Sequence, residues 1–428
     1  MTSFRFLISL LLLGAIVSFP LGATDYERPP ISYASAQTQD IIAPLIEKIR
    51  AGKFVLAHDD KHGYLEALLK ELQIPRSSQV LVFSKTSLQR QRISPKTPRA
   101  IYFNDDVTVG FCLRGDVLEV AAADPNLGTV FYTLDQDETH GVRFTRQTES
   151  CLICHGSSSN QGFPGHLIRS VSADRTGELV LSRGTKRVDH STPFKERWGG
   201  WYVTGTSGKQ QHLGNRIFNG RFDDEGEWGG NLTDLKSYFT VNNYLEPGSD
   251  LVALMVLEHQ GEAHNRLTRA NYLTRLALVE QAEMNRILSN SANERSDGIT
   301  RRIERACETV VEYLMFCEEA KLSEPLRGTS EFANDFQARG PFDSKGRSLR
   351  QFDLKTRMFR YPLSYVIYSR LFDGLPEEAK ARVYKRIWEV LTGQDQSKEF
   401  GHISLEDRGA ILEILLETKK DLPCYWKK

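Results

Sequence analysis

Two thiols and an imidazole lie together in this sequence at a spacing that can do chemistry. Cys151 and Cys154 are separated by two residues, and His155 follows at once in the segment CLICH. A protein that attaches a c-type haem uses this spacing, because both thiols bond to the porphyrin and the histidine binds the iron. We therefore predict one covalent haem c, held by these three residues, with His155 as the proximal iron ligand.

The same motif has two other interpretations, a dithiol redox pair and half of a zinc site. A redox pair should follow a buried strand and open a long helix, but the next residues, GSSSNQGFPG, are typical of a loop. A zinc site needs a second close pair of ligands, whereas the other cysteines are scattered singly. These are Cys112, Cys307, Cys317 and Cys424. Their pairing stays open, although one predicted helix places Cys307 about 15 Å from Cys317, too far for a disulfide.

The sixth ligand decides whether a haem iron carries electrons or reacts with small molecules. Our first candidate is His259, on a helix predicted to begin near Asp250, with Met255 one turn earlier and His212 as the next candidates. The histidine at 264 is turned about 140° from His259 on that helix, so only one of the two can face the haem. The remaining candidates are His166, His190, His264 and Met358. Two alternatives stay open: His259 is a buried, hydrogen-bonded residue that does not bind the iron, or no protein side chain occupies the sixth position of the iron.

The N-terminal segment has the pattern of an export signal. One cation at Arg5 precedes an apolar run from Phe6 to Phe19, and small residues end at Ala23. We predict a signal peptide at 1–23, with an uncleaved anchor as the alternative, and a flexible leader at 24–37. The predicted location is the periplasm or the extracellular space.

The overall charge balance excludes some classes of partner. The chain has 428 residues, of which 55 are basic and 55 acidic, so no charge excess points to nucleic acid or to an anionic membrane. No later segment reaches 18 consecutive apolar residues, and we expect no membrane span after signal removal. The predicted partners are periplasmic redox proteins or quinone-linked donors.

Hydrophobic periodicity divides the rest of the chain into two regions. Strands are predicted at 79–83, 100–103, 107–111, 117–122, 129–134, 142–145, 167–172, 179–182 and 201–204, and helices at 38–49, 63–72, 250–289, 299–320, 363–373, 376–392 and 403–419. We predict an α+β protein with a β-rich, haem-bearing region at 38–249 and a helical region at 250–428. A strand-like segment precedes the motif in this chain, whereas the small all-helical cytochrome c fold has a helix at that place. We therefore do not expect that fold.

Longer blocks of sequence accompany the motif. They include PRAIYFNDDVTVGF, DPNLGTVFYTLDQ, CLICHGSSS, ERWGGWYVTGTSG, and MVLEHQ with HNRLT. Together they resemble a family of exported bacterial monohaem c-type cytochrome-like proteins that has no characterised function. The resemblance covers most of residues 60–392 and implies secretion and a single covalent haem, but no assigned reaction. Its motif positions here are Cys151, Cys154, His155, His259 and His264.

These observations predict single-electron transfer between periplasmic partners. The competing hypothesis is a haem enzyme or ligand sensor, peroxidase-like or gas-binding, with an open distal position at which Glu258 or His259 serves as acid or base. The carboxylates of a haem need cationic partners, and Arg169, Arg183 and Arg197 are the candidates. His58 and His62 flank an acidic turn, where a surface loop is the simpler interpretation than a metal site.

Overall fold

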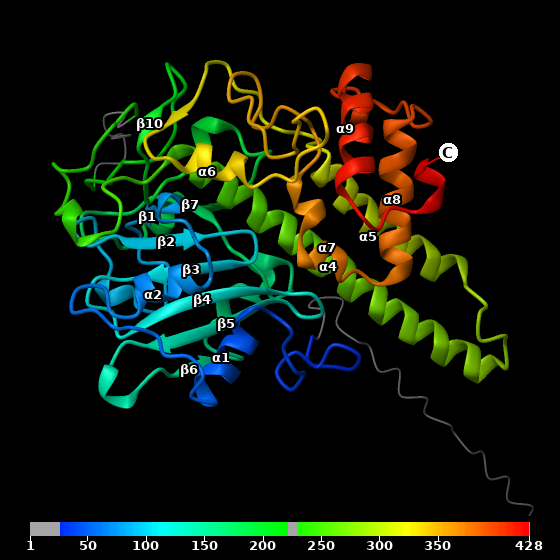
Figure 1. Ribbon diagram of the computed structural model, residues 1–428, viewed down its shortest axis with the longest axis horizontal. Coiled ribbons are helices and arrows are strands. Elements are labelled where there is room, and N and C mark those ends of the chain that lie inside the picture. The colour runs from blue at the N-terminus through cyan, green and yellow to red at the C-terminus, as the bar shows by residue number, and fades with distance from the viewer. Residues whose placement is uncertain (1–25, 221–229, 428) are drawn as a thin grey trace, which may run out of the picture.

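The computed structural model describes residues 26–220 and 230–427 (Figure 1). The predicted signal peptide, 1–23, lies outside the described residues. Within them the fold is α+β, with a β-rich first half and a helical second half, and it is not the small all-helical cytochrome c fold. No helix of the described residues is both long and apolar enough to cross a membrane.

In the part of the chain that the structure describes, seven strands form one antiparallel sheet in the order β6-β5-β4-β3-β2-β1-β9. The strands are β1 (Val80–Val82), β2 (Arg99–Phe103), β3 (Val107–Phe111), β4 (Val117–Asp124), β5 (Gly128–Asp135), β6 (Phe144–Arg146) and β9 (Trp201–Tyr202). Neighbours in sequence pair along β1 to β6, and short turns join the strands from β2 to β5, as the turn residues between β-branched and aromatic runs predict. Val109 pairs with Val120, and Ala122 pairs with Val130.

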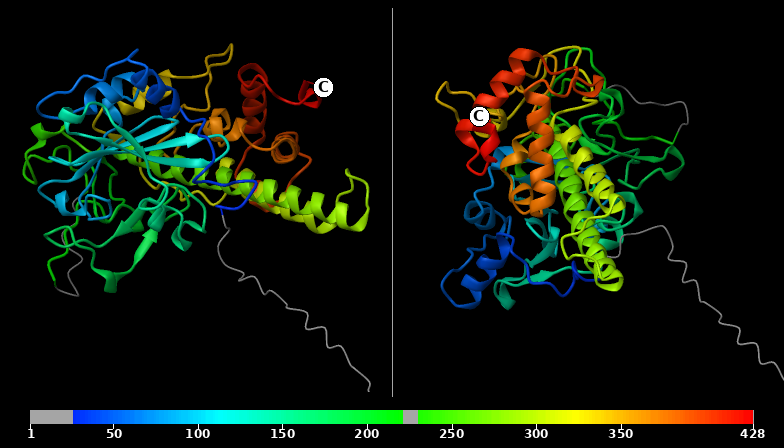
Figure 2. Two further views of the ribbon diagram at one scale, coloured as in Figure 1. Left: turned by 90° about the horizontal axis from the view of Figure 1, so that it is seen from below. Right: turned by 90° about the vertical axis from the view of Figure 1, so that its right-hand side faces the viewer.

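Alternating residues of the sheet enter two different cores, because successive side chains of a strand point to opposite faces. Leu81 and Tyr102 belong to a core that includes helices α1 (Ile42–Arg50) and α2 (Leu65–Glu71), which cover one face of the sheet (Figures 1 and 2). Val82 and Ile101 belong to a second core shared with the helical half. The sheet therefore joins the two halves of the molecule.

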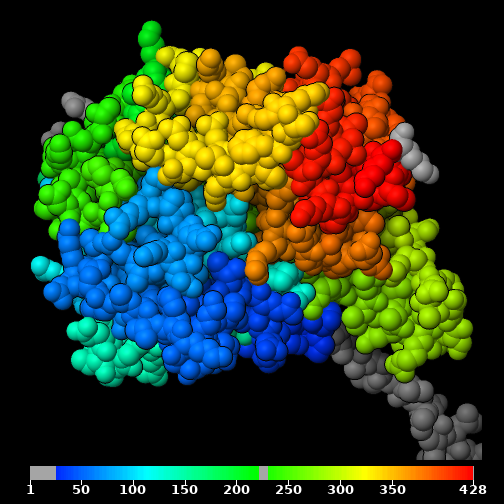
Figure 3. Space-filling model, viewed as in Figure 1, coloured from blue at the N-terminus to red at the C-terminus, as the bar shows by residue number. Residues whose placement is uncertain are grey.

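A long helix, α4 (Leu251–Leu288), organises the helical half (Figure 2). Asp250 caps it by accepting hydrogen bonds from Val252 N and Ala253 N, at 2.8 and 2.9 Å. Its first turns are buried, and the helix contacts the sheet at β5 and the helices α5 (Asp297–Leu314), α6 (Phe332–Ala338), α7 (Arg370–Asp373) and α8 (Glu377–Leu391). Helix α9 (Leu405–Thr418) packs against α8. In the space-filling view the later segments pack directly on the N-terminal half (Figure 3).

Three predicted elements differ from the observed ones. In place of the helix predicted at 363–373, the chain forms a 3-10 turn at Tyr365–Tyr368 and then the short helix α7. Residues 179–182 are not a strand: Leu181–Arg183 is a 3-10 turn, and the partner of β7 (Arg169–Val171) is β8 (Thr185–Arg187). The predicted helix at 299–320 ends early, since Phe316 and Glu318 have positive φ angles of 57° and 63°. The remaining short elements are α3 (Leu152–His155), β10 (Gly205–Thr206) and β11 (Arg327–Gly328).

Candidate haem attachment site

The CLICH motif forms a single helical turn directly after the sheet. Cys151 is the residue before α3, and His155 N donates to Cys151 O at 3.0 Å. Residues three and four apart share one side of a helix, so the turn groups the two cysteines with the histidine. Leu152 is buried and anchors the turn, whereas Cys154 is exposed and Cys151 half-buried. Both thiols are therefore accessible for chemistry.

The imidazole of His155 is held in one orientation. Its Nδ1 lies 2.8 Å from Gly165 O, and because a carbonyl only accepts, Nδ1 must carry the proton. Burial lowers the pKa of His155, which favours the neutral form of the ring. The ring also packs on Phe131, with centroids 4.7 Å apart. Nε2 has no hydrogen-bond partner among the described residues, so its lone pair is available to a metal, as in histidines that bind iron through one nitrogen and a backbone carbonyl through the other.

Two asparagines fix the loop that supplies this carbonyl. Asn160 Nδ2 donates to His155 O and to Phe163 O, at 3.1 and 2.8 Å. Asn265 of α4 accepts from His166 N at 2.8 Å and donates to His166 O at 2.9 Å. The long helix thus positions Gly165, and through it the ring of His155. Neither asparagine was predicted from the sequence. Asn160 lies in the loop itself, and no local spacing connects that loop with Asn265, about a hundred residues later.

The position of Gly165 allows a direct test of this arrangement. A Cβ there would lie 2.1 Å from Asn265 Oδ1 and 2.6 Å from Asn160 Nδ2. We expect Gly165→Ala to push both amides aside and to lower the free energy of unfolding by about 1–3 kcal/mol, measured by urea denaturation. The matched control is Gly298→Ala on α5, where a Cβ meets nothing within 4 Å. Equal stability of the two variants would contradict the loop arrangement.

The thiols do not have the properties of a reactive dithiol pair. Burial raises the pKa of Cys151 to about 11, whereas catalytic redox cysteines have lowered pKa values. All six cysteines are free within the described residues. In that part of the chain, the only three potential metal ligands gathered within 4.8 Å of one another are Asp59, His62 and Glu66, so the motif does not form a compact zinc site. These properties do not favour the redox-pair and zinc interpretations of the motif.

The three candidate cations differ in their surroundings. Arg197 is buried, contacts Glu258 through Nη1, and donates from Nη2 to His190 O at 2.8 Å. Arg183 donates to Ser172 Oγ at 3.2 Å and belongs to another hollow. Arg169 is half-buried on β7, and its charge lowers the pKa of His155. Arg169 is therefore the candidate that lies near the motif.

The first distal candidate, His259, lies in the core of the helical half. Its Nδ1 is 2.8 Å from His190 Nδ1, and its Nε2 is 2.7 Å from Ser364 Oγ. The ring stacks on Phe316 with centroids 4.6 Å apart. This geometry is that of a buried, hydrogen-bonded histidine. To bind the iron through Nε2, His259 would have to break its hydrogen bond with Ser364.

The other two distal candidates also have partners within the protein. Met255 is buried in the same core as the first turns of α4. His212 Nδ1 accepts from Gly214 N at 3.1 Å, and the ring packs edge-on against Trp198 at 5.2 Å. Ligation of the iron by either Met255 or His212 stays a prediction.

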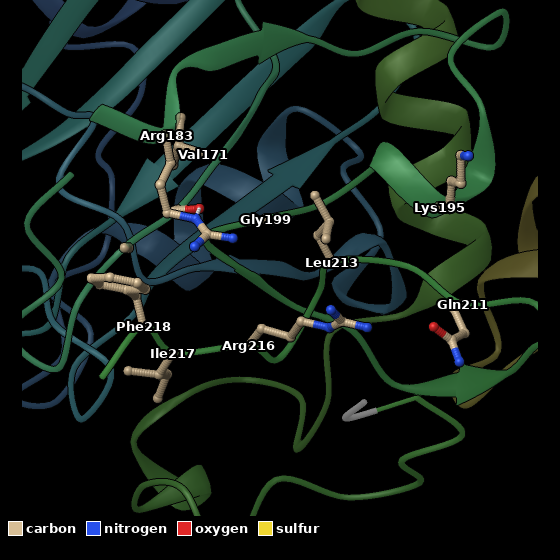
Figure 4. A pocket seen from close by; sticks show the side chains of 11 residues that line it. Val171, Arg183, Lys195, Gly199, Gln211, Leu213, Arg216, Ile217 and Phe218 are labelled. Carbon is tan, nitrogen blue, oxygen red and sulfur yellow. Dashed lines mark hydrogen bonds between the residues drawn. The ribbon is translucent and has the colours of Figure 1, made fainter. Parts of the chain in front are cut away.

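A cationic hollow of about 250 Å³ lies beside β7 (Figure 4). Three cationic side chains from separate segments contribute to it, Arg183, Lys195 and Arg216, and Figure 4 shows Phe218 on its wall. No acidic side chain is among the described residues that line it. Its charge would favour an anion, but it is built from different residues than the CLICH site.

A larger hollow of about 910 Å³ lies in the helical half, lined among others by His190, Tyr313, Cys317 and Glu319. Burial raises the pKa of Glu319 from 4.5 to about 7, although its carboxylate accepts a hydrogen bond from Met358 N at 2.8 Å. The folded protein therefore binds a proton more tightly than the unfolded chain, and stability falls as the pH rises from 4.5 to about 7.

Replacing Glu319 by Gln should remove this pH dependence while an amide oxygen keeps the bond from Met358. We expect Glu319→Gln to be more stable than the parent by about 1–3 kcal/mol at about pH 8 and nearly equal to it at about pH 5, measured by urea denaturation. Glu283→Gln, at an exposed position of α4, is the control. If the free energies of unfolding of Glu319→Gln and the parent differed by the same amount at both pH values, the pH dependence could not be assigned to Glu319.

The fold and the motif together define the class: an α+β protein that presents two accessible thiols and one oriented imidazole beside an antiparallel sheet. This chain matches no known protein-family model, no curated protein and no solved structure.

Proposed function

We propose that this chain is an exported c-type cytochrome, which binds one haem covalently through Cys151 and Cys154 and uses His155 as the proximal iron ligand. The observation that carries the proposal is the state of His155: Nδ1 is bonded to Gly165 O at 2.8 Å, and Nε2 is left for a metal beside two accessible thiols. In the proposed function, the protein transfers single electrons between periplasmic redox proteins or from quinone-linked donors.

The residues of the site fit a haem in three respects. The thiols of one helical turn are free to form two thioether bonds, and the imidazole of His155 is presented on the same turn. The side chain of Arg169 is a cation available to a haem carboxylate near His155. A bound haem iron would supply one-electron redox chemistry. The protein would hold the proximal ligand still through Asn160, Gly165 and Asn265, so that little reorganisation accompanies electron transfer.

A second function is favoured by the contacts of His259. Both of its ring nitrogens already have partners, His190 and Ser364. If these bonds persist in the loaded protein, His259 does not bind the iron. A haem enzyme or ligand sensor with an open distal position is then the alternative.

An optical spectrum distinguishes the two functions. A low-spin spectrum that does not change on addition of cyanide to the oxidised protein, or of carbon monoxide to the reduced protein, supports the electron carrier. A high-spin spectrum that shifts with either ligand contradicts the carrier and supports the alternative. The same measurement on His259→Ala tests the distal ligand, since a change from low spin to high spin is expected only if His259 binds the iron.

A further inference from the structure

The most unusual buried polar group outside the CLICH motif is His264. It lies on α4, the residue is 1% exposed, and neither ring nitrogen has a hydrogen-bond partner among the residues that the structure describes. A buried donor or acceptor without a partner costs about 1–3 kcal/mol, and this ring has one of each. An imidazole in that state indicates that a ligand completes its surroundings.

A second imidazole lies beside it. The ring centroids of His166 and His264 are 5.8 Å apart, at 49° between their planes. Gly261, one turn before His264, makes this approach possible, because a Cβ there would lie 3.2 Å from His166 Cβ. Asn265, one residue after His264, holds both backbone polar groups of His166. Helix α4 therefore places the second ring against the first.

A histidine binds a metal ion through a neutral imidazole. Burial lowers the pKa of His166 to about 3 and that of His264 to about 4, so the two rings are neutral at physiological pH. The charge of Asp105 acts on the pKa of His264 in the opposite direction, but Asp105 is bound by Arg339 at 3.1 Å and by Arg350 at 3.2 Å. In the described part of the chain, neither histidine belongs to a cluster of three potential ligands within 4.8 Å.

We propose that His166 and His264 form a two-imidazole site for one copper(I) ion. Imidazole suits copper, zinc, iron and nickel, but structural zinc takes four ligands and catalytic zinc three. Two nitrogen ligands are enough to coordinate copper(I), and this ion brings only a single positive charge into the protein interior. His166 and His264 are also among the candidate distal iron ligands, and His166 follows Gly165, whose carbonyl accepts a hydrogen bond from His155. Copper binding and distal ligation of the iron by these two histidines are therefore mutually exclusive.

Titration with copper(I) under anaerobic conditions, in competition with a colorimetric chelator, tests the proposal on the mature full-length chain. We expect one equivalent to bind in the parent, and at least a tenfold loss of affinity in His166→Ala and in His264→Gln. The glutamine keeps most of the buried volume, and unfolding curves show whether each variant folds. His140→Ala, at an exposed position, should bind as the parent does.

The thiols of Cys151 and Cys154 could also bind copper(I). A variant that lacks both thiols distinguishes binding by the cysteines from binding by the histidines. Cys151→Ser with Cys154→Ser should retain the copper equivalent, whether or not the parent carries a haem. Loss of copper binding in this background, unchanged binding in both histidine variants, or no binding in the parent would overturn the proposal. Preferential binding of zinc(II) by the same two histidines would also overturn the choice of metal.

Discussion

Arg197→Met should lower the free energy of unfolding by about 3–5 kcal/mol, because it leaves a buried carboxylate without its ion partner. The exposed fractions of the Arg197 and Glu258 side chains are 2% and 0%. Glu258 also accepts from Trp198 Nε1 at 2.8 Å. Burial already raises the pKa of Glu258 to about 7 despite the guanidinium. Without that guanidinium the pKa should rise further.

The sign of the pH dependence follows from this shift. An acid whose pKa is raised on folding contributes less stability as the pH rises above its unfolded value, so the defect of Arg197→Met should be larger at pH 8 than at pH 5. Urea denaturation at the two pH values measures it. Arg175→Met, at an exposed position, should change stability by no more than about 0.5 kcal/mol. The double variant Arg197→Met with Glu258→Met should recover much of the loss, and a double variant as unstable as the single one would contradict the ion-pair account.

His155→Gly should leave the haem attached to the two cysteines but remove the proximal ligand of the iron. The expected result is conversion of the oxidised protein from a low-spin to a high-spin spectrum, with retention of the haem after denaturation. Added free imidazole should restore the original spectrum, because it can enter the space left by the ring. His140→Ala, at an exposed position, is the control and should change nothing. An unchanged spectrum in His155→Gly would show that another residue binds the iron on that side.

The strands and the long helix could be predicted because their signals are local. Alternation of apolar residues marks β3 (Val107–Phe111) at the predicted bounds, and the helix predicted at 250–289 is observed at Leu251–Leu288. Errors occurred where backbone conformation overrides the hydrophobic pattern. Phe316 and Glu318 adopt positive φ angles, which end α5 before the apolar run ends. Residues 179–182 are apolar enough for a strand, but the hairpin pairs β7 with 185–187 instead.

The candidate site was only partly predictable for a related reason. The spacing of Cys151, Cys154 and His155 is contained in five residues, so the sequence alone defines it. The partners of His259 and the asparagine that holds His166 come from segments about 70 to 105 residues away. Such contacts depend on how α4 packs against the loops, which no local periodicity encodes. The pairing of His166 with His264 was missed in the same way.

The mass of the denatured mature protein tests the central claim most directly. The protein should be made in a bacterial host with working haem-attachment machinery, with Cys151→Ser/Cys154→Ser as the control. We expect the parent to carry the added mass of one haem under denaturing conditions, on the peptide that contains Cys151 and Cys154, and the control to have the mass of the polypeptide alone. A parent protein with only its polypeptide mass would contradict the account.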